Sequence, residues 1–204
     1  MKVRVALLCL AAAMLCTALP ASANNLSYSF GVPTGTLGTS QAYTVNGITL
    51  TAYGFDNSSH PMNLYGKNDG GDETGLGISR APDHEIQTNN FVQLDVTSLH
   101  SLNLLDALIS FGSVQEGEGW KLYGSNSLGS LGTLLMSGSQ DMGSTNILSE
   151  VKNYDFIGIQ ASSHDVLLSS LTVDYNTQSV PEPGSVLLLG SGVVGLARKL
   201  RKSK

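Results

Sequence analysis

The stretch YTVNGITLTAY, residues 43–53, is the part of the chain that most directly indicates its fold. Apolar and polar residues alternate on both sides of the Asn46-Gly47 pair, and the alternating apolar residues are Tyr43, Val45, Ile48, Leu50 and Ala52. An Asn-Gly pair accepts the positive φ angles of the two-residue turn that joins neighbouring antiparallel strands. The stretch therefore predicts a β-hairpin with one apolar face.

The same alternation returns in short segments along most of the chain. They are FVQLDV (91–96), LLDALISFG (104–112), GWKLYG (119–124), LGTLLMSG (131–138), DFIGIQA (155–161) and DVLLSSLTVDY (165–175). In the first of them Val92, Leu94 and Val96 share one face, which leaves Gln93 and Asp95 on the other. About nine short strands between turn residues predict an all-β protein, an antiparallel β-sandwich or jelly roll. A βαβ fold would need helical crossovers of about 10–15 residues, which the pattern does not show.

Three segments depart from this alternation. Residues 56–80, continuing to 87, and residues 124–130, extended by 137–144, are polar and predict long loops on the sandwich. Residues 144–153, STNILSEVKN, are the one candidate for a helix. Long loops on a compact sandwich are either functional or partly disordered.

The first 23 residues have the organisation of a secretory signal peptide. A positively charged start precedes the uncharged apolar residues 5–19, and an Ala-Ser-Ala triplet ends at Ala23, after which we expect cleavage. An apolar core helix would not explain this order. Both cysteines, Cys9 and Cys16, lie in this segment, so the mature protein has no thiol for a disulfide, a Cys-ligated zinc or a cysteine nucleophile.

Between its two ends the chain is strongly acidic. Residues 24–179 contain four lysines and arginines against fifteen aspartates and glutamates, a net formal charge of −11. Such a body repels phosphate backbones, which argues against nucleic-acid binding, and it suits a surface protein or one that collects divalent cations. About 155 residues are enough for a hydrophobic core without disulfides.

The chain ends in VPEPGSVLLLGSGVVGLARKLRKSK, residues 180–204. Residues 184–197 are uncharged and would span roughly 21 Å as a helix, less than the roughly 30 Å of a bilayer core. A basic cluster follows at Arg198, Lys199, Arg201, Lys202 and Lys204, which favours a cytoplasmic C-terminus. We expect a short hydrophobic helix, brief for a transmembrane segment, with the body outside the cytoplasm.

The order of these parts resembles the PEP-CTERM sorting tail of bacterial envelope proteins. The matching residues are the motif Pro181, Glu182 and Pro183, the apolar residues 185–196 and the basic residues 198–204. In that family the tail is recognised by exosortase, a membrane-embedded cysteine protease-transpeptidase that cuts near the motif and passes the protein on to the cell surface or matrix. The resemblance implies signal peptidase and exosortase as partners in export. It also implies three parts: signal peptide (1–23), β-sandwich domain (24–178) and sorting tail (179–204).

The body resembles the glycine- and serine-rich β-sandwich domains that these proteins commonly carry. The matching pieces are GGDETGLGI (70–78), DHEI (83–86), WKLYG (120–124), YDFIGIQA (154–161) and DVLLSSLTVDY (165–175). This second resemblance implies a fold and no biochemical activity.

The acidic stretch KNDGGDETGLGISRAPDHEI, residues 67–86, is the candidate metal site. Calcium takes about six to eight oxygen ligands, and five carboxylates are available here: Asp69, Asp72, Glu73, Asp83 and Glu85. The spacing is not that of an EF-hand. Two other interpretations stay open, a solvated polar loop whose Asp and Asn residues satisfy their own turns, and a loop that Glu73 and Glu85 organise internally without metal.

Signals for catalysis are few. The four histidines lie in different segments without zinc spacing, and no Gly-x-Ser-x-Gly motif is present. On a strand, Glu116 and Glu118 would share one side beside Trp120 and suggest a sugar-processing pair, although glycosidase carboxylates normally come from different elements across a cleft. A charged turn before a core tryptophan is the plainer interpretation. Trp120 with Tyr123 could also stack on carbohydrate, although core packing explains Trp120 better.

Together these patterns predict a non-enzymatic protein, exported through an inner-membrane-tethered precursor, whose mature form is at the cell surface or extracellular. The expected role is structural or adhesive in a biofilm or exopolysaccharide matrix. The alternatives are a carbohydrate-binding module for extracellular polysaccharide and, further off, a secreted hydrolase. No cofactor is expected apart from calcium.

Overall fold

The computed structural model describes residues 22–139 and 143–177 of the 204-residue chain. These residues form a compact unit over Ala23–Asn176. The predicted signal peptide up to residue 21, the sorting tail and its hydrophobic helix lie outside the described residues.

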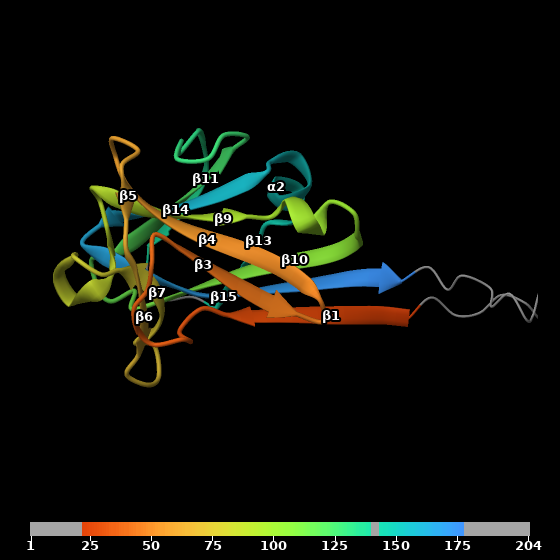
Figure 1. The fold of residues 1–204 in the computed structure, drawn as a ribbon, viewed down its shortest axis with the longest axis horizontal. Helices are drawn as coiled ribbons and strands as arrows, with labels where there is room; N and C mark the ends of the chain where they lie inside the picture. The colour runs from red at the N-terminus through yellow and green to blue at the C-terminus, as the bar shows by residue number, and fades with distance from the viewer. Residues whose placement is uncertain (1–21, 140–142, 178–204) are drawn as a thin grey trace, which may run out of the picture. The chain divides into compact units, whose positions relative to one another are not determined.

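Two antiparallel sheets pack face to face (Figure 1). Sheet 1 contains β1 (Ser22–Ser29), β2 (Gly35–Thr36), β6 (Leu64–Asn68), β7 (Thr74–Ile78), β8 (Ile86–Gln87), β10 (Asn103–Gly112), β13 (Ser144–Asn146) and β15 (Asp165–Thr177). Sheet 2 contains β3 (Ser40–Val45), β4 (Ile48–Asp56), β5 (Pro61–Met62), β9 (Asn90–Asp95), β11 (Gly119–Ser125), β12 (Thr133–Ser139) and β14 (Phe156–Ser163). The predicted all-β antiparallel sandwich is confirmed.

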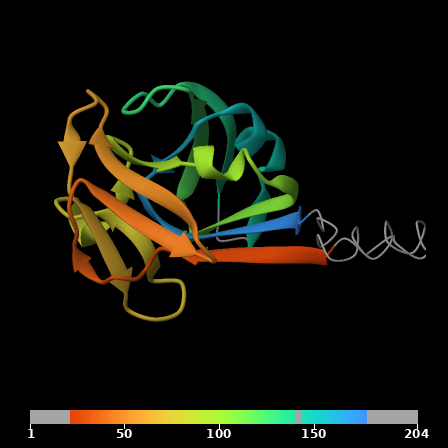
Figure 2. The ribbon, with the colours of Figure 1, turned by 45° about the vertical axis from the view of Figure 1, so that its right-hand side comes forward.

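The order of strands shows how the two sheets are tied together. Sheet 1 runs β13-β10-β15-β7-β6-β2, with β1 and β8 also paired to β15, and sheet 2 runs β12-β11-β14-β9-β4-β3, with β5 paired to β4. From β9 onward the chain crosses repeatedly from one sheet to the other. Figures 1 and 2 both show β1 beside β15 along one side of the sandwich. Strands that are far apart in the sequence therefore pair with one another, and the loops that connect them lie at the ends of the sheets.

The predicted hairpin at residues 43–53 is the pair β3–β4. Val45 is paired with Ile48 across the turn, and Asn46 and Gly47 have φ angles of 50° and 80°. Both positive values are those of the two-residue turn that matches the twist of the strands. Leu50 and Ala52 have no exposed surface, so the alternation correctly identified the buried face.

The core lies between the sheets and is filled from both sides. Its members without exposed surface include Leu76, Ile109 and Leu171 from sheet 1 and Leu94 and Ile159 from sheet 2. Burying a side chain of this size stabilises the fold by about 1.5–3 kcal/mol relative to leaving it in water. No disulfide is needed to hold two such faces together.

The predicted long loop over residues 56–80 is wrong, because this segment contains β5, β6 and β7. Its glycines misled the prediction, since they occupy strand positions where another backbone lies too close for a side chain. A Cβ at Gly66 would overlap the carbonyl of Pro33, and one at Gly77 would overlap the carbonyl of His84. At Gly75 a Cβ would lie 2.7 Å from the carbonyl oxygen of Leu168. The glycines therefore permit other segments of the chain to pack closely against the strands of sheet 1.

The second predicted loop and the predicted helix are correct only in part. Residues 126–132 connect β11 to β12, but residues 137–139 belong to β12, and residues 140–142 lie outside the described part. The helix is α2 (Leu148–Asn153), preceded by β13 instead of a further helical turn. Short 3-10 turns η1 (Pro82–His84) and η2 (Thr97–Leu99) complete the unit.

Candidate functional site

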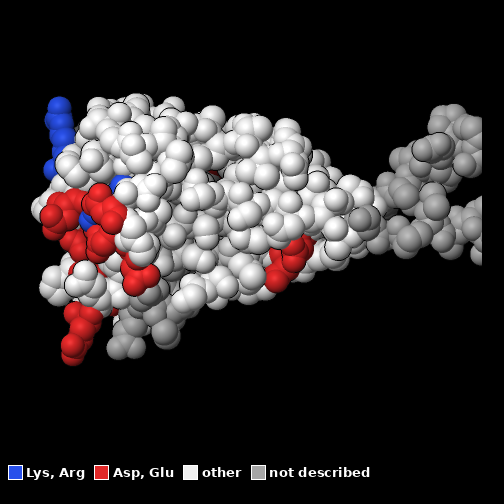
Figure 3. All heavy atoms as spheres, turned by 90° about the horizontal axis from the view of Figure 1, so that it is seen from below, with Lys and Arg blue, Asp and Glu red and all other residues white. Residues whose placement is uncertain are grey.

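Acidic side chains gather at the end of the sandwich that carries β6 and β7 (Figures 1 and 3). The β6–β7 turn holds Asp69 and Asp72, both exposed, and closes through a hydrogen bond from the Asp69 amide to the Glu73 carbonyl at 3.0 Å. Asp83 is exposed in η1 with a φ of 53°. Glu85 follows η1 and is buried, with 2% of its surface exposed. The five predicted calcium ligands therefore have very different surroundings.

Two of these carboxylates share a lysine. The Lys67 Nζ donates to Glu73 Oε2 and, at 2.6 Å, to Glu85 Oε1. The Ser113 hydroxyl lies between the same two carboxylates, 3.1 Å from Glu73 Oε1 and 3.0 Å from Glu85 Oε1. Glu85 Oε2 is buried and has no hydrogen-bond partner among the described residues. This cluster, Lys67–Glu73–Glu85–Ser113, joins β6, the β6–β7 turn, the segment after η1 and the residue that follows β10.

The two carboxylates differ in burial, and their pKa values are shifted in opposite directions. The pKa of Glu85 is raised to about 7: burial raises it most, the hydrogen bonds from Lys67 and Ser113 lower it, and the charge of Asp165 adds a smaller increase. The hydrogen bond from Lys67 holds the pKa of the more exposed Glu73 below its usual value. For Lys67 burial lowers the pKa, but the bonds to both carboxylates outweigh burial and the net direction is upward.

The described residues do not bring the predicted ligands together as a metal site. Within residues 22–139 and 143–177 no group of three or more His, Cys, Asp or Glu side chains is arranged to hold a metal ion. Glu73 and Glu85 instead stabilise the β6–β7 hairpin internally through Lys67 and Ser113, which fits the interpretation of a loop that they organise without metal. Calcium binding itself stays a prediction.

The aromatic pair Trp120 and Tyr123 does not form a surface platform. Trp120 is 8% exposed and stacks on Phe111 with ring centroids 4.4 Å apart. Tyr123 is three positions further along β11, on the opposite face, and donates its hydroxyl to Gln160 at 3.3 Å. A carbohydrate site that depends on these two rings lying together has no basis in the fold, and core packing accounts for Trp120.

Glu116 and Glu118 lie in the turn before β11, so the expected strand geometry is wrong and the charged turn before a core tryptophan is what the structure has. The turn closes through a bond from the Glu118 amide to the Gln115 carbonyl at 3.0 Å. Burial raises the pKa of Glu118, the Gln115 amide lowers it, and the neighbouring Asp165 raises it again. The partner of Glu118 is thus Asp165 and not Glu116.

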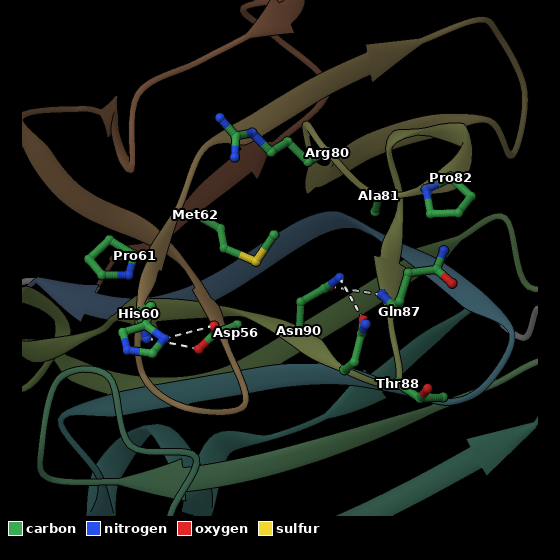
Figure 4. Close-up of a pocket in the computed structure, with 11 residues that line it drawn as sticks. Asp56, His60, Pro61, Met62, Arg80, Ala81, Pro82, Gln87, Thr88 and Asn90 are labelled. Carbon is green, nitrogen blue, oxygen red and sulfur yellow. Dashed lines mark hydrogen bonds and ion pairs between the residues drawn. The ribbon is translucent and has the colours of Figure 1, made fainter.

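A pocket of about 540 Å³ opens at the same end of the sandwich (Figure 4). The residues that line it are Asp56, His60, Pro61, Met62, Arg80, Ala81, Pro82, Gln87, Thr88, Asn89 and Asn90. They come from the ends of β4, β5, β8 and β9 and from the segment between β7 and η1. The volume lies in the usual range of ligand pockets, about 300–1,000 Å³.

One wall of the pocket is a rigid acidic turn. Asp56 Oδ1 accepts the amides of Ser58 at 2.8 Å and His60 at 2.9 Å, and Asp56 Oδ2 lies 3.0 Å from His60 Nδ1. The backbone bond from His60, followed by its side-chain bond, holds the pKa of Asp56 below its usual value. The turn therefore presents a fixed carboxylate, with an imidazole beside it, to the pocket.

The opposite wall carries amides and a cation. Asn90 is 3% exposed, accepts the Gln87 amide at 2.9 Å through Oδ1 and donates to Asn89 Oδ1 at 3.2 Å. The Gln87 side chain is held by Asp165 at 3.0 Å. Arg80 is exposed and, within the described residues, makes no hydrogen bond or ion pair. In Figure 4 its side chain extends toward the side where Pro61 and Met62 lie.

These pocket residues were not predicted as a site, although most of them fall in the segment 56–87, which was predicted to be a long loop. The signal was the turn composition at the strand ends, DNSSHP at residues 56–61 and QTNN at residues 87–90. What joins the two stretches is the pairing of β4 with β9 from Thr51↔Asp95 to Asp56↔Asn90. That pairing is a long-range contact, which local pattern does not give.

The comparison with known families concerns the C-terminal residues. Residues 179–202 match the family model described as the PEP-CTERM protein-sorting motif. No curated protein and no solved structure matches the chain. No helix of residues 22–139 or 143–177 is long and apolar enough to cross a membrane. The match confirms the resemblance noted from Pro181, Glu182 and Pro183: the chain carries a PEP-CTERM sorting motif, which indicates an exported protein sorted by exosortase.

Proposed function

We propose that this protein is a non-enzymatic structural or adhesive component of an extracellular polysaccharide matrix, and that it holds saccharide in the pocket at the β6–β7 end of the sandwich. The sorting motif at residues 179–202 supports delivery to the cell surface or beyond it. We further propose that the precursor is held at the inner membrane by the tail, with its C-terminus in the cytoplasm, until exosortase acts.

The observation that carries the binding role is the mixed lining of the pocket. Pro61, Met62, Ala81 and Pro82 offer apolar surface for the C–H face of a sugar ring. Asp56, Asn90 and Gln87 place a carboxylate and two amides around the same space. Sites for small polar ligands combine apolar walls with a few fixed polar groups in this way.

The same lining favours binding over hydrolysis. Glycosidases use two carboxyl groups about 5–9.5 Å apart on either side of the bond that is cut. Among the described residues that line the pocket, Asp56 is the one carboxylate. Glu118 and Asp165, which do lie close together, are not lining residues. Carbohydrate binding, unlike hydrolysis, does not need a pair of carboxylates, so the lining of this pocket fits binding.

The test blocks the pocket without disturbing the core. Thr88 is exposed at the rim, so Thr88→Trp fills the opening, while Thr133→Trp adds the same ring to exposed β12 as a matched control. Mature protein released by its host is run through gels containing the host's extracellular polysaccharide. We expect retardation of the wild type and of Thr133→Trp, and loss of it in Thr88→Trp. Equal retardation of both variants, or none for the wild type, would overturn the proposal.

A further inference from the structure

We propose that Arg80 makes this pocket selective for acidic sugars by binding the carboxylate of a uronic acid unit. The inference rests on the proposed saccharide-binding function and names the ligand class of that same site. Three observations support it: Arg80 has no carboxylate partner among the described residues, apolar and amide groups line the same pocket, and the surrounding surface is acidic.

Arg80 is a free cation in an acidic protein. It is one of four lysines and arginines in residues 24–179, against fifteen carboxylates. Lys67, thirteen positions earlier, has two carboxylate partners, while Arg80 has none within the described residues. A guanidinium presents a planar fork of donors that matches a carboxylate bidentately. Its fork is thus available to a ligand.

The neighbours of Arg80 fit a carboxylated sugar better than a simple anion. In Figure 4 the Arg80 side chain extends away from Ala81 and Pro82 and toward the side of Met62, so the apolar surface on the side of the cation is that of Met62 and Pro61. Asn90 carries two amide hydrogens and gives one of them to Asn89, which leaves a donor for a hydroxyl among the described residues. An inorganic anion would use the guanidinium but neither the apolar wall nor the amide.

The pocket also orients such a ligand. Asp56 is held as an acceptor by the Ser58 and His60 amides, so it repels a carboxylate and accepts a hydroxyl hydrogen. Arg80 attracts the carboxylate instead. A uronate unit therefore binds with its acid group toward Arg80 and its hydroxyls toward Asp56 and Asn90. A neutral sugar would leave the guanidinium without a partner.

The acidic surface narrows the ligand class further. Acidic side chains gather at this end of the sandwich (Figure 3), and charges within about 8 Å still interact at physiological ionic strength. A polymer with a carboxylate on every unit is repelled by them. The ligand expected is one in which acidic units alternate with neutral sugars.

The experiment is calorimetry at about 0.15 M salt with three probe oligosaccharides of equal length. They are a hyaluronan fragment with alternating glucuronate, an oligogalacturonate and a neutral chitin fragment. For the mature wild-type protein we expect the highest affinity for the alternating probe, a lower affinity for the fully acidic probe and the lowest for the neutral probe. Arg80→Gln should weaken binding of the alternating probe at least tenfold and leave binding of the neutral probe unchanged. The affinity of Arg80→Lys for the alternating probe should lie between those of the wild type and Arg80→Gln.

Lys152→Gln, an exposed cation on α2 outside the pocket, is the matched control and should bind all three probes like the wild type. If the neutral probe binds as well as the acidic ones and Arg80→Gln changes nothing, the inference is overturned while saccharide binding stands. If no probe binds, and Thr88→Trp does not alter retardation by polysaccharide, the proposed function fails as well.

Discussion

At the scale of single residues, Lys67 is shared by two carboxylates that differ in exposure. The Glu73 side chain is 34% exposed and the Glu85 side chain 3%. The exposed partner keeps its charge beside Lys67, whereas the buried one, with Oε2 unpartnered among the described residues, favours the proton. Glu85 is therefore a residue through which a change of pH alters the stability of this end of the sandwich.

Glu85→Gln should remove a pH dependence of stability. Because the pKa of Glu85 rises from 4.5 to about 7 on folding, the native protein binds more protons than the unfolded chain between these values. The free energy of unfolding of the wild type should fall by on the order of 2 kcal/mol as the pH rises through this window. Urea titrations from pH 4.5 to 7.5 measure it.

The matched control for that titration is Glu116→Gln, which removes an exposed carboxylate from the nearby turn. It should keep the slope of the wild type over the same window. A Glu85→Gln protein that also keeps the slope would show that the proton is bound elsewhere.

Chelation tests the calcium prediction at the same residues. With Lys67 seated between Glu73 and Glu85, two of the five predicted ligands are already engaged by a cation of the chain itself. The interpretation in which Glu73 and Glu85 organise the loop without metal predicts the same melting temperature with millimolar calcium and with chelator. A higher melting temperature in calcium would establish the site, since a ligand of the native state must stabilise it.

At the scale of elements, glycine explains where sequence patterns succeeded and where they failed. Asn46-Gly47 predicted the β3–β4 turn because positive φ is a local property. Gly66 and Gly77 were taken for loop residues, yet they are strand positions pressed against the backbone of Pro33 and His84. Which backbone approaches a strand is decided by tertiary packing, and composition alone does not contain it.

Gly77→Ala should destabilise the protein strongly. Its Cβ would overlap the backbone carbonyl of His84, which cannot rotate away as a side chain would. We expect a loss of about 3 kcal/mol in the free energy of unfolding. Gly38→Ala is the control, because its Cβ would lie 3.6 Å from the nearest atom, the carbonyl oxygen of Ser40. Urea denaturation that places the two variants at equal stability would contradict the packing described for β7.

The loop between β11 and β12 depends on a buried amide that the alternation placed on the outer face of β9. Gln93 has no exposed surface, accepts the Gly129 amide at 2.7 Å and donates to the Ser130 carbonyl at 2.9 Å. The alternation assigned the face of Gln93 correctly, but residues 126–132 cover that face. A polar residue on the outer face of a sheet can thus be buried by a distant loop.

Gln93→Ala should release this loop. Three hydrogen bonds are lost, those to the Ser127 and Ser130 carbonyls and the one from the Gly129 amide, and leaving such buried groups unpaired should cost about 1–3 kcal/mol. Hydrogen exchange of the Gly129 amide should accelerate. Exchange in the β10–β15 pair should change only as much as the free energy of global unfolding changes. Gln115→Ala, at an exposed position, is the control. Unchanged protection at Gly129 would contradict the role of Gln93.

At the scale of the whole molecule, the sequence predicted what is encoded locally. Strand alternation gave the sandwich, and the order of motif, apolar run and basic end gave the sorting tail that the family match bears out. The pocket was not predictable, because it forms where β4 pairs with β9 and β8 with β15 across distant parts of the chain. No local sequence pattern indicates that Arg80 and Asn90 line the same pocket.

The most direct measurement of the central claim concerns the sorting motif. Pro181, Glu182 and Pro183 are changed together to alanine in the full chain, with Val180→Ala as the neighbouring control. Cell fractions from the host are then analysed for the location and intact mass of the protein. The account predicts a triple variant that keeps its tail and stays with the inner membrane, and a control that is processed and released like the wild type. Release of the triple variant at the mature mass would contradict sorting by exosortase.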